Sequence, residues 1–273
     1  MKAVKLIARY ISVAAVLAVV LLPMYWVVIS SFKTVPELTS PTPTFWPRTF
    51  TLEHYVRLFE QVPFFTYFLN SVYVALASTA ITLVLASLAA YSVYRCKYRG
   101  RELLFRTFIS IYIFPRVLLI IPLYVTFTKL GIIDTLLALV IVNVTVVAPF
   151  SIWMLRAFFT GVPLDLEDAA MVDGASRLQV LVRIFLPLSA PGLAALALNS
   201  FLMSWTEYLF AVAFIISDRY KTLPVGIAHF LQQYFIDWGL LMSSSVIIAI
   251  PPILLFALAG RWFITGLTAG AIK

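Results

Sequence analysis

The sequence predicts an all-α integral membrane protein with six transmembrane helices. Hydrophobic residues make up 62% of its 273 residues, and charged residues make up only 12%. The mean hydropathy is +1.00. A soluble domain of this length could not bury so much apolar surface, so composition alone argues against a soluble fold class.

Each transmembrane helix is expected where an apolar run approaches the roughly 20 residues needed to cross the hydrocarbon core. These runs are 11–32, 68–94, 107–128, 135–155, 192–217 and 238–260. Arg116 in the third run and Glu207 in the fifth are their only charges. The first run could instead be a signal peptide. However, its apolar core exceeds the usual length of about 7–15 residues, and no small-x-small cleavage pattern follows it.

The basic residues predict the orientation. With the N-terminus in the cytoplasm, most Lys and Arg residues fall in cytoplasmic segments, for example Arg95, Lys97 and Arg99. This bias predicts that both termini lie on the cytoplasmic side of the cell membrane. The net charge of +8 is therefore attributed to topology signals rather than to a nucleic-acid site, which would gather basic residues in one patch.

The outer segment 33–67 is rich in proline at its start and then predicts a short helix. Leu52, Tyr55, Val56 and Phe59 follow one another at i, i+3, i+4 and i+7, which places them on one helical face. Two interpretations remain open. The helix lies at the membrane interface, or its apolar face meets an external partner.

The cytoplasmic segment 157–191 predicts a hairpin of two helices rather than a simple connector. Pro163 suits the first turn of a helix, and Gly174 can end that helix in a left-handed conformation. Ser176 and Gln179 form a capping box for the second helix, and Pro187 ends it. The apolar face of the second helix is expected to comprise Leu178, Leu181, Val182 and Phe185.

Within this hairpin the sequence resembles the EAA motif of permease subunits of ABC importers. The stretch 168–175 reads D-A-A-M-V-D-G-A, close to the family form E-A-A-x-x-D-G-A, and L-P follows at 186–187. Asp168 replaces the usual Glu. Further stretches resemble the carbohydrate-importer branch related to the maltose permease MalG: 51–55, 70–71, 89–92, 122–123, 204–208 and 266–273. Thr206 departs from the Asn that is usual after the tryptophan.

The resemblance implies a single MetI-like permease domain over 1–273 that forms half of a translocation path for a di- or oligosaccharide. It further implies a second homologous permease, a dimer of ATP-binding subunits, an extracytoplasmic sugar-binding protein and membrane lipid as partners. The residues that it assigns to coupling with the ATPase are Glu167, Asp168, Ala169, Ala170, Met171, Asp173 and Gly174. The chain has no G-x-x-x-x-G-K-[ST] sequence, so ATP and Mg are expected on the partner ATPase, and no cofactor is expected in this chain.

The isolated charges inside the membrane are candidates for the path. A charged residue at midspan costs roughly 2.5–3.5 kcal/mol on insertion scales, so Glu207 should face a cavity or a partner, and Arg116 is the obvious partner. Aromatic faces stack on sugar rings, and carboxylates and amides bond to hydroxyls. The candidate path residues are therefore Asn199, Trp205, Glu207, Tyr208 and Arg116. The alternative is a structural pair without contact to substrate.

Two other functions remain as alternatives. An ion-gradient-driven secondary transporter could use Glu207 as its coupling carboxylate, although the hairpin would then have no purpose. A membrane enzyme would need converging catalytic groups, and the only histidines, His54 and His229, lie in outer segments without a nucleophile motif. No catalytic or metal site is therefore predicted, and the single cysteine, Cys96, excludes an internal disulfide.

Overall fold

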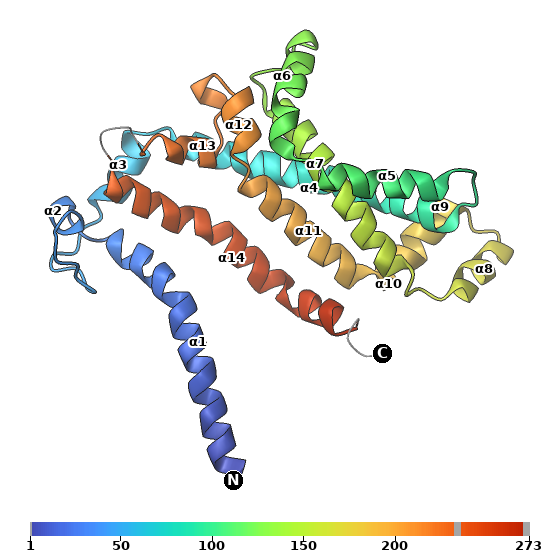
Figure 1. Cartoon of the computed structure of the whole chain (residues 1–273), viewed down its shortest axis with the longest axis horizontal. Helices are drawn as coiled ribbons and strands as arrows, with labels where there is room; N and C mark the ends of the chain where they lie inside the picture. The colour runs from blue at the N-terminus through green and yellow to red at the C-terminus, as the bar shows by residue number, and fades with distance from the viewer. Residues whose placement is uncertain (1, 232–235, 270–273) are drawn as a thin grey trace. The chain divides into compact units, whose positions relative to one another are not determined.

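The computed structural model describes residues 2–231 and 236–269, and helices joined by loops make up their fold. Within these ranges, β-structure is limited to one isolated bridge between Leu231 and Ile236. In the described part of the chain, four helices contain stretches long and apolar enough to cross a membrane. Up to six spans result there if two bent helix pairs each count as one, namely Arg101–Ile113 with Arg116–Lys129 and Arg177–Leu188 with Ala190–Trp205. The long helices are α1 (Lys2–Ser30), α4 (Phe64–Arg95), α7 (Leu136–Phe159) and α14 (Trp238–Ala269) (Figure 1). The all-α class is confirmed.

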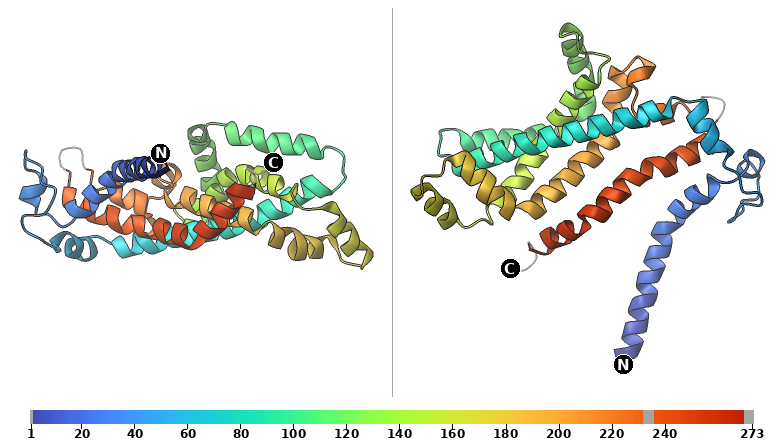
Figure 2. Two further views of the ribbon diagram at one scale, coloured as in Figure 1. Left: turned by 90° about the horizontal axis from the view of Figure 1, so that it is seen from below. Right: turned by 180° about the vertical axis from the view of Figure 1, so that it is seen from behind.

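The third predicted span, 107–128, is not one straight helix. α5 (Arg101–Ile113) is followed by a 3-10 turn, η1 (Arg116–Leu119), and by α6 (Ile120–Lys129), with a bend of 98° at the break (Figure 2). Phe114 is extended, with φ −66° and ψ 134°, as expected for a residue before proline. Pro115 therefore ends α5, and Arg116 lies at the break rather than midway along a span.

The fifth predicted span, 192–217, is also interrupted. α11 (Ala190–Trp205) ends ahead of Glu207, and a new short helix, α12 (Leu209–Phe214), follows. The Glu207 carboxylate accepts N–H groups from Phe210 and Ala211, which belong to the first turn of α12. A carboxylate in this place starts a helix, so the apolar run does not continue as a single helix.

The chain forms two compact units. The first is drawn from Met1–Phe65 and Gly226–Pro251, and it contains α1, α2 (Val35–Leu38), α3 (Glu53–Glu60) and the start of α14. The second is drawn from Thr66–Val225 and Pro252–Lys273 and contains most of the other helices.

In the first unit, α3 confirms the predicted short helix but buries a different face. His54 and Leu58 are fully buried, whereas Leu52, Val56 and Phe59 are all at least half exposed. The Nε2 atom of His54 lies 2.8 Å from the Lys33 carbonyl oxygen. A Cβ at Gly239 would lie 2.1 Å from the His54 ring, so only glycine fits there. His54 is therefore a packed core residue rather than an ordinary loop residue.

The core of the second unit lies along α7, which packs against α5, α11 and α12. One apolar cluster joins α7 to α12 through Val142, Phe210 and Phe214. A second cluster surrounds Phe159, Leu181 and Phe185 at the other end of α7. The two clusters hold two polar features in place: a hairpin at one end of the unit and a cavity near α12.

The segment that follows α12 is fixed to the start of α4. It contains η3 (Asp218–Tyr220) and leads into α13 (Leu223–Ala228). The Asn70 side-chain amide donates to the carbonyl oxygens of Arg219 and Lys221, at 2.9 and 2.8 Å. The Ser71 hydroxyl accepts the N–H of Leu223. The resemblance at 70–71 therefore falls on two side chains that fix a loop.

Candidate coupling hairpin and polar cavity

The segment 157–191 folds as two helices joined by a tight turn. α8 (Leu164–Val172) begins directly after Pro163, and Gly174 closes it with a left-handed φ of +84°. α9 (Arg177–Val180) begins with the predicted capping box, in which Ser176 and Gln179 bond to each other's backbone N–H. The local signals in the sequence therefore predicted the turn and both helix starts correctly.

The second helix of the hairpin departs from a regular α-helix. A π-helical turn, η2 (Leu181–Phe185), joins α9 to α10 (Leu186–Leu188). It ends two residues before Pro187, which lacks an N–H and would clash with the carbonyl four residues earlier in a regular helix. Pro187 lies within α10, so the helix does not end at this proline as the sequence predicted. The wide turn changes the buried face: Val180, Leu181 and Phe185 are buried, but the predicted Leu178 and Val182 are exposed.

Glu167 points inward and ties α8 to the end of α4. Only 5% of its side chain is exposed, and its carboxylate pairs with the Arg95 guanidinium. The Tyr91 hydroxyl donates to the same carboxylate at 3.0 Å. Because both partners lie on α4, this contact sets the direction in which α8 projects (Figure 2). Glu167, which the resemblance assigns to coupling, therefore lies on the face of α8 that packs against α4.

The outward surface of α8 is formed by the other residues of the motif. The Asp168 side chain is 76% exposed, with one oxygen 3.9 Å from Arg95. Met171 and Val172 are exposed hydrophobic side chains, and Ala169 is exposed beside them. A groove of about 420 Å³ runs next to this surface and is lined in part by Ala170, Asp173, Gly174, Gln179 and Arg183. The hairpin thus presents an anchored helix with a mixed apolar and acidic surface.

A separate polar cavity of about 280 Å³ lies where α11 ends and α12 begins. Arg116, Glu207 and Tyr208, three of the five predicted path residues, line it together. The carboxylate of Glu207 is held by the backbone N–H groups of Phe210 and Ala211, at 2.7 and 3.0 Å. Both oxygens of the Glu207 carboxylate therefore accept hydrogen bonds from the first turn of α12.

The direct pair of Arg116 with Glu207 that the sequence predicts does not form. Among the described side chains, no ion pair joins the two, although they share one cavity. The physical reason is that both residues lie at helix breaks, where the backbone N–H groups of Phe210 and Ala211 already donate to the two oxygens of the acid.

The two remaining path candidates do not line this cavity. Trp205 is 1% exposed and packs among rings, stacked on Phe201 at 5.5 Å and edge-on to Phe68 at 5.8 Å. Asn199 is half-buried on α11, outside the lining.

Three further side chains line the cavity and were not predicted from the sequence: Asn143, Met203 and Thr206. Asn143 is 4% exposed and donates to the Leu139 carbonyl, so it remains inside α7 without breaking it. It is the only amide within the apolar run 135–155, and that signal could have identified it.

No metal-binding cluster of three or more His, Cys, Asp or Glu side chains occurs within the described residues. The resemblance at the C-terminal end, 266–273, reaches the end of α14, but 270–273 lie outside the described residues.

The sequence profile described as "Binding-protein-dependent transport system inner membrane component" matches residues 82–268, more than half of the chain. A similar curated protein is the inner membrane ABC transporter permease protein YcjP of Escherichia coli (strain K12). It is 38% identical over 269 residues, which cover 98% of this chain and 96% of that protein. The trehalose/maltose transport system permease protein MalG of Thermococcus litoralis is 39% identical over 257 residues, covering 93% of this chain and 91% of that protein.

A solved structure shares the fold. It is a subunit of a bacterial ABC transporter involved in the import of the acidic polysaccharide alginate, with a TM-score of 0.80. The alignment covers 95% of this chain and 96% of that one at 19% sequence identity, so the likeness concerns the fold alone.

Proposed function

The chain belongs to the family of binding-protein-dependent transport system inner membrane components, and from this premise we propose that it imports a di- or oligosaccharide as one half of an ABC permease. It is a transport subunit rather than an enzyme, because the family consists of permeases. Relatives named for trehalose and maltose uptake support the choice of sugar. We take the whole chain, 1–273, as one multi-pass permease domain in the cell membrane.

One observation supports the coupling role: the anchored hairpin. Glu167 fixes α8 to α4 through Arg95 and Tyr91. The exposed side chains of α8 then form a fixed surface that an ATP-binding subunit can contact, and they include Asp168, Met171 and Val172. Force applied to α8 would pass through the buried ion pair into α4, which is one of the long membrane helices.

We propose six spans, of which the third is the bent pair α5–α6 and the fifth is α11 together with the segment after it, and we place both termini in the cytoplasm. The excess of Lys and Arg in the segments placed inside supports this orientation. The hairpin then faces the ATPase, and segment 33–67 faces the external binding protein that the family description names.

We propose that the polar cavity at the start of α12 contacts the sugar. Arg116 and Asn143 supply N–H donors, Glu207 supplies acceptors, and Tyr208 supplies an aromatic face beside them. Trp205 and Asn199 would not contact the sugar but would hold α11, whose end borders the cavity, in place. Each Glu207 oxygen accepts one backbone N–H and keeps a second lone pair for a sugar hydroxyl. The match to ABC importer permeases, rather than these hydrogen bonds, argues against an ion-gradient-driven transporter.

The experiment that tests coupling is substrate-stimulated ATP hydrolysis by the complex purified through a tag on this chain. Asp168→Lys reverses a charge on the exposed surface of α8, and we expect it to remove at least 90% of the stimulation. Glu102→Lys makes a comparable charge reversal at an exposed carboxylate of α5, outside both the hairpin and segment 33–67, and should leave the stimulation intact. Equal loss in both variants, or the absence of any copurifying ATPase, would contradict the proposed function.

A further inference from the structure

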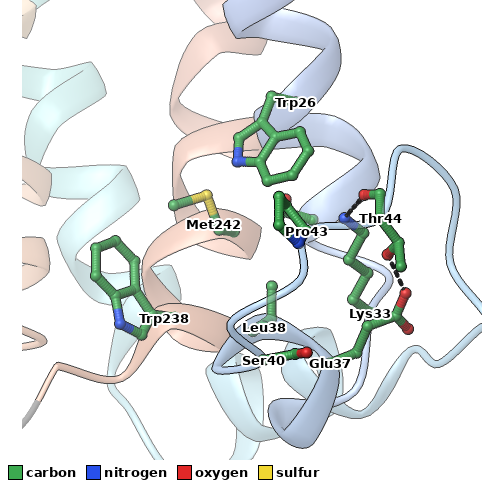
Figure 3. Close-up of a pocket in the computed structure, with 10 residues that line it drawn as sticks. Trp26, Lys33, Glu37, Leu38, Ser40, Pro43, Thr44, Trp238 and Met242 are labelled. Carbon is green, nitrogen blue, oxygen red and sulfur yellow. Dashed lines mark hydrogen bonds between the residues drawn. The ribbon is translucent and has the colours of Figure 1, made fainter.

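The first unit contains a cavity that is smaller than the one at α12. Its lining residues are far in sequence from those that line the proposed path. Its volume is about 220 Å³, and its walls come from the end of α1, the segment 33–44 and the start of α14 (Figure 3). All of these belong to the same compact unit. At this size the cavity falls below the roughly 300–1,000 Å³ of sites for drug-sized ligands, so it suits a single ring rather than a chain of rings.

The two walls of this cavity differ in character. Trp26, Met242 and Trp238 stand on one side in Figure 3, and Lys33, Glu37 and Thr44 stand on the other. Trp238 is 42% exposed, so part of its ring is open to an incoming molecule. A cavity with one aromatic wall and one polar wall matches a ligand that is apolar on one face and rich in hydroxyls around its edge.

The polar wall is charged and ordered. Lys33 is only 2% exposed, and its ammonium lies 4.2 Å from the centroid of the Trp26 ring while donating to the Thr44 carbonyl oxygen. The Thr44 hydroxyl donates to Glu37, and mainly for this reason the pKa of Glu37 lies below its ordinary value. An ammonium carries three N–H donors and a carboxylate accepts at several positions, so donors and acceptors lie side by side.

One buried polar group in the lining has no partner. Ser30 is 1% exposed, and its hydroxyl has no hydrogen-bond partner within the described part of the chain. Leaving a buried hydroxyl unsatisfied is unfavourable, so a polar group that enters the cavity would gain a hydrogen bond to Ser30.

We propose that this cavity binds one pyranose unit of the cargo sugar before it enters the path, with the ring stacked against Trp238 and Trp26 and its hydroxyls bonded to Ser30, Lys33 and Glu37. The inference rests on the proposed function, because it takes segment 33–67 to face the side from which sugar arrives. It adds a receiving site on this chain that is separate from the cavity at α12.

The test is photolabelling of the full transporter complex in nanodiscs with diazirine derivatives of maltose and trehalose, followed by peptide mapping. We expect label on peptides that contain 26–44 or 238–242, removed by an excess of the unmodified sugar. Ser30→Val replaces the hydroxyl by methyl groups, and Trp238→Ala removes the stacking face. Each should reduce this label at least five-fold. Trp46→Ala, which changes a 68% exposed tryptophan outside the lining, should leave it unchanged.

The possible outcomes separate the two proposals. A wild-type complex whose ATP hydrolysis ignores both the binding protein and the sugar overturns the proposed function itself. A complex that responds to sugar but carries label only near 203–210 overturns the receiving site alone. If Ser30→Val and Trp238→Ala leave the label intact but weaken capture of the binding protein, the cavity receives a protein side chain, and the inference is wrong. Copurification of the ATPase with each variant shows that the variant is folded.

Discussion

Glu167 and Glu207 are both largely withdrawn from solvent, but they are satisfied in different ways. Glu167 pairs with Arg95, 72 residues away along the chain, and with Tyr91. Glu207 accepts from two backbone N–H groups three and four residues ahead of it. The first contact joins two helices, and the second only starts one. A glutamate side chain therefore connects two helices in the hairpin, whereas a second glutamate beside the cavity caps a single helix.

The largest effect is expected from breaking the connection. Glu167→Ala leaves Arg95, whose side chain is 18% exposed, without its carboxylate. Removal of one partner of a buried ion pair costs about 3 kcal/mol or more, so the unfolding midpoint of the purified protein should fall markedly. Asp168→Ala, at an exposed carboxylate of the same helix, is the matched control.

Adding Arg95→Ala to Glu167→Ala should recover part of this loss, because the double variant leaves no unpaired guanidinium. A midpoint for Glu167→Ala that matches that of Asp168→Ala would show that the pair holds nothing together. The contrast with Glu207 would then have no energetic basis.

A smaller effect is expected at the cap. Glu207→Ala removes the acceptor for the first turn of α12 and should cost about 1–2 kcal/mol, as loss of other helix caps does. Glu207→Gln keeps one acceptor oxygen and should cost less. Thermal unfolding of the three proteins in one detergent measures the series.

Reversing the charges together, as Glu207→Arg with Arg116→Glu, should not restore the cap, because the acceptor is still missing where the N–H groups point. Full recovery of stability and uptake in the double reversal would mean that the two side chains pair directly after all.

The turn of the hairpin should be less sensitive than its anchor. Gly174 has φ +84°, and a Cβ there would meet no atom within 4 Å. The cost of Gly174→Ala is therefore backbone strain alone, about 1 kcal/mol. Gly174→Asn should cost less, because Asn tolerates this conformation better. Equal destabilisation by Ala and Asn in thermal unfolding would contradict the strain argument.

The smallest effect concerns pH and a third carboxylate, Asp134, which resembles Glu207 in using backbone donors. Burial tends to raise the pKa of Asp134, but hydrogen bonds from Ser217 and Ile216 outweigh it and lower the pKa below the ordinary value of 3.8. Because the folded pKa is the lower one, the stabilisation is present above pH about 4 and is lost as pH falls through the folded value.

Wild type and Asp134→Asn should therefore differ in thermal midpoint at pH 7, and the difference should shrink as the pH is lowered below 3.8. A difference that stays the same throughout an acid titration would show that the ionised form of Asp134 is not what holds this loop.

The sequence predicted the hairpin well because its signals are local. Pro163, Gly174 and the pair Ser176–Gln179 each act within a few residues of themselves, so their meaning does not depend on tertiary structure. The burial of Glu167 could not be predicted in the same way, since it depends on Arg95, which lies on another helix.

The hydropathy runs do not show the helix breaks, because hydropathy counts apolar residues without asking whether the backbone continues through them. The run 107–128 includes Pro115, and the run 192–217 includes Glu207, and each residue has a backbone reason to interrupt a helix. The predicted pair of Arg116 with Glu207 failed for the same reason. It considered side-chain charges alone and left out the N–H groups at the start of α12.

The π-helical turn η2 bears on how this hairpin can change in length during evolution. A wide turn holds one residue more than an α-helical turn, and the helix on either side of it keeps its phase. Loss of one residue among 181–185 would close the wide turn and leave α8 aimed as before. Gain or loss of a residue elsewhere in 177–188 would rotate α8 by about 100° about the helix axis. Lineages of this chain should therefore tolerate a single-residue deletion at this turn and almost no other change of length between Ser176 and Ser189.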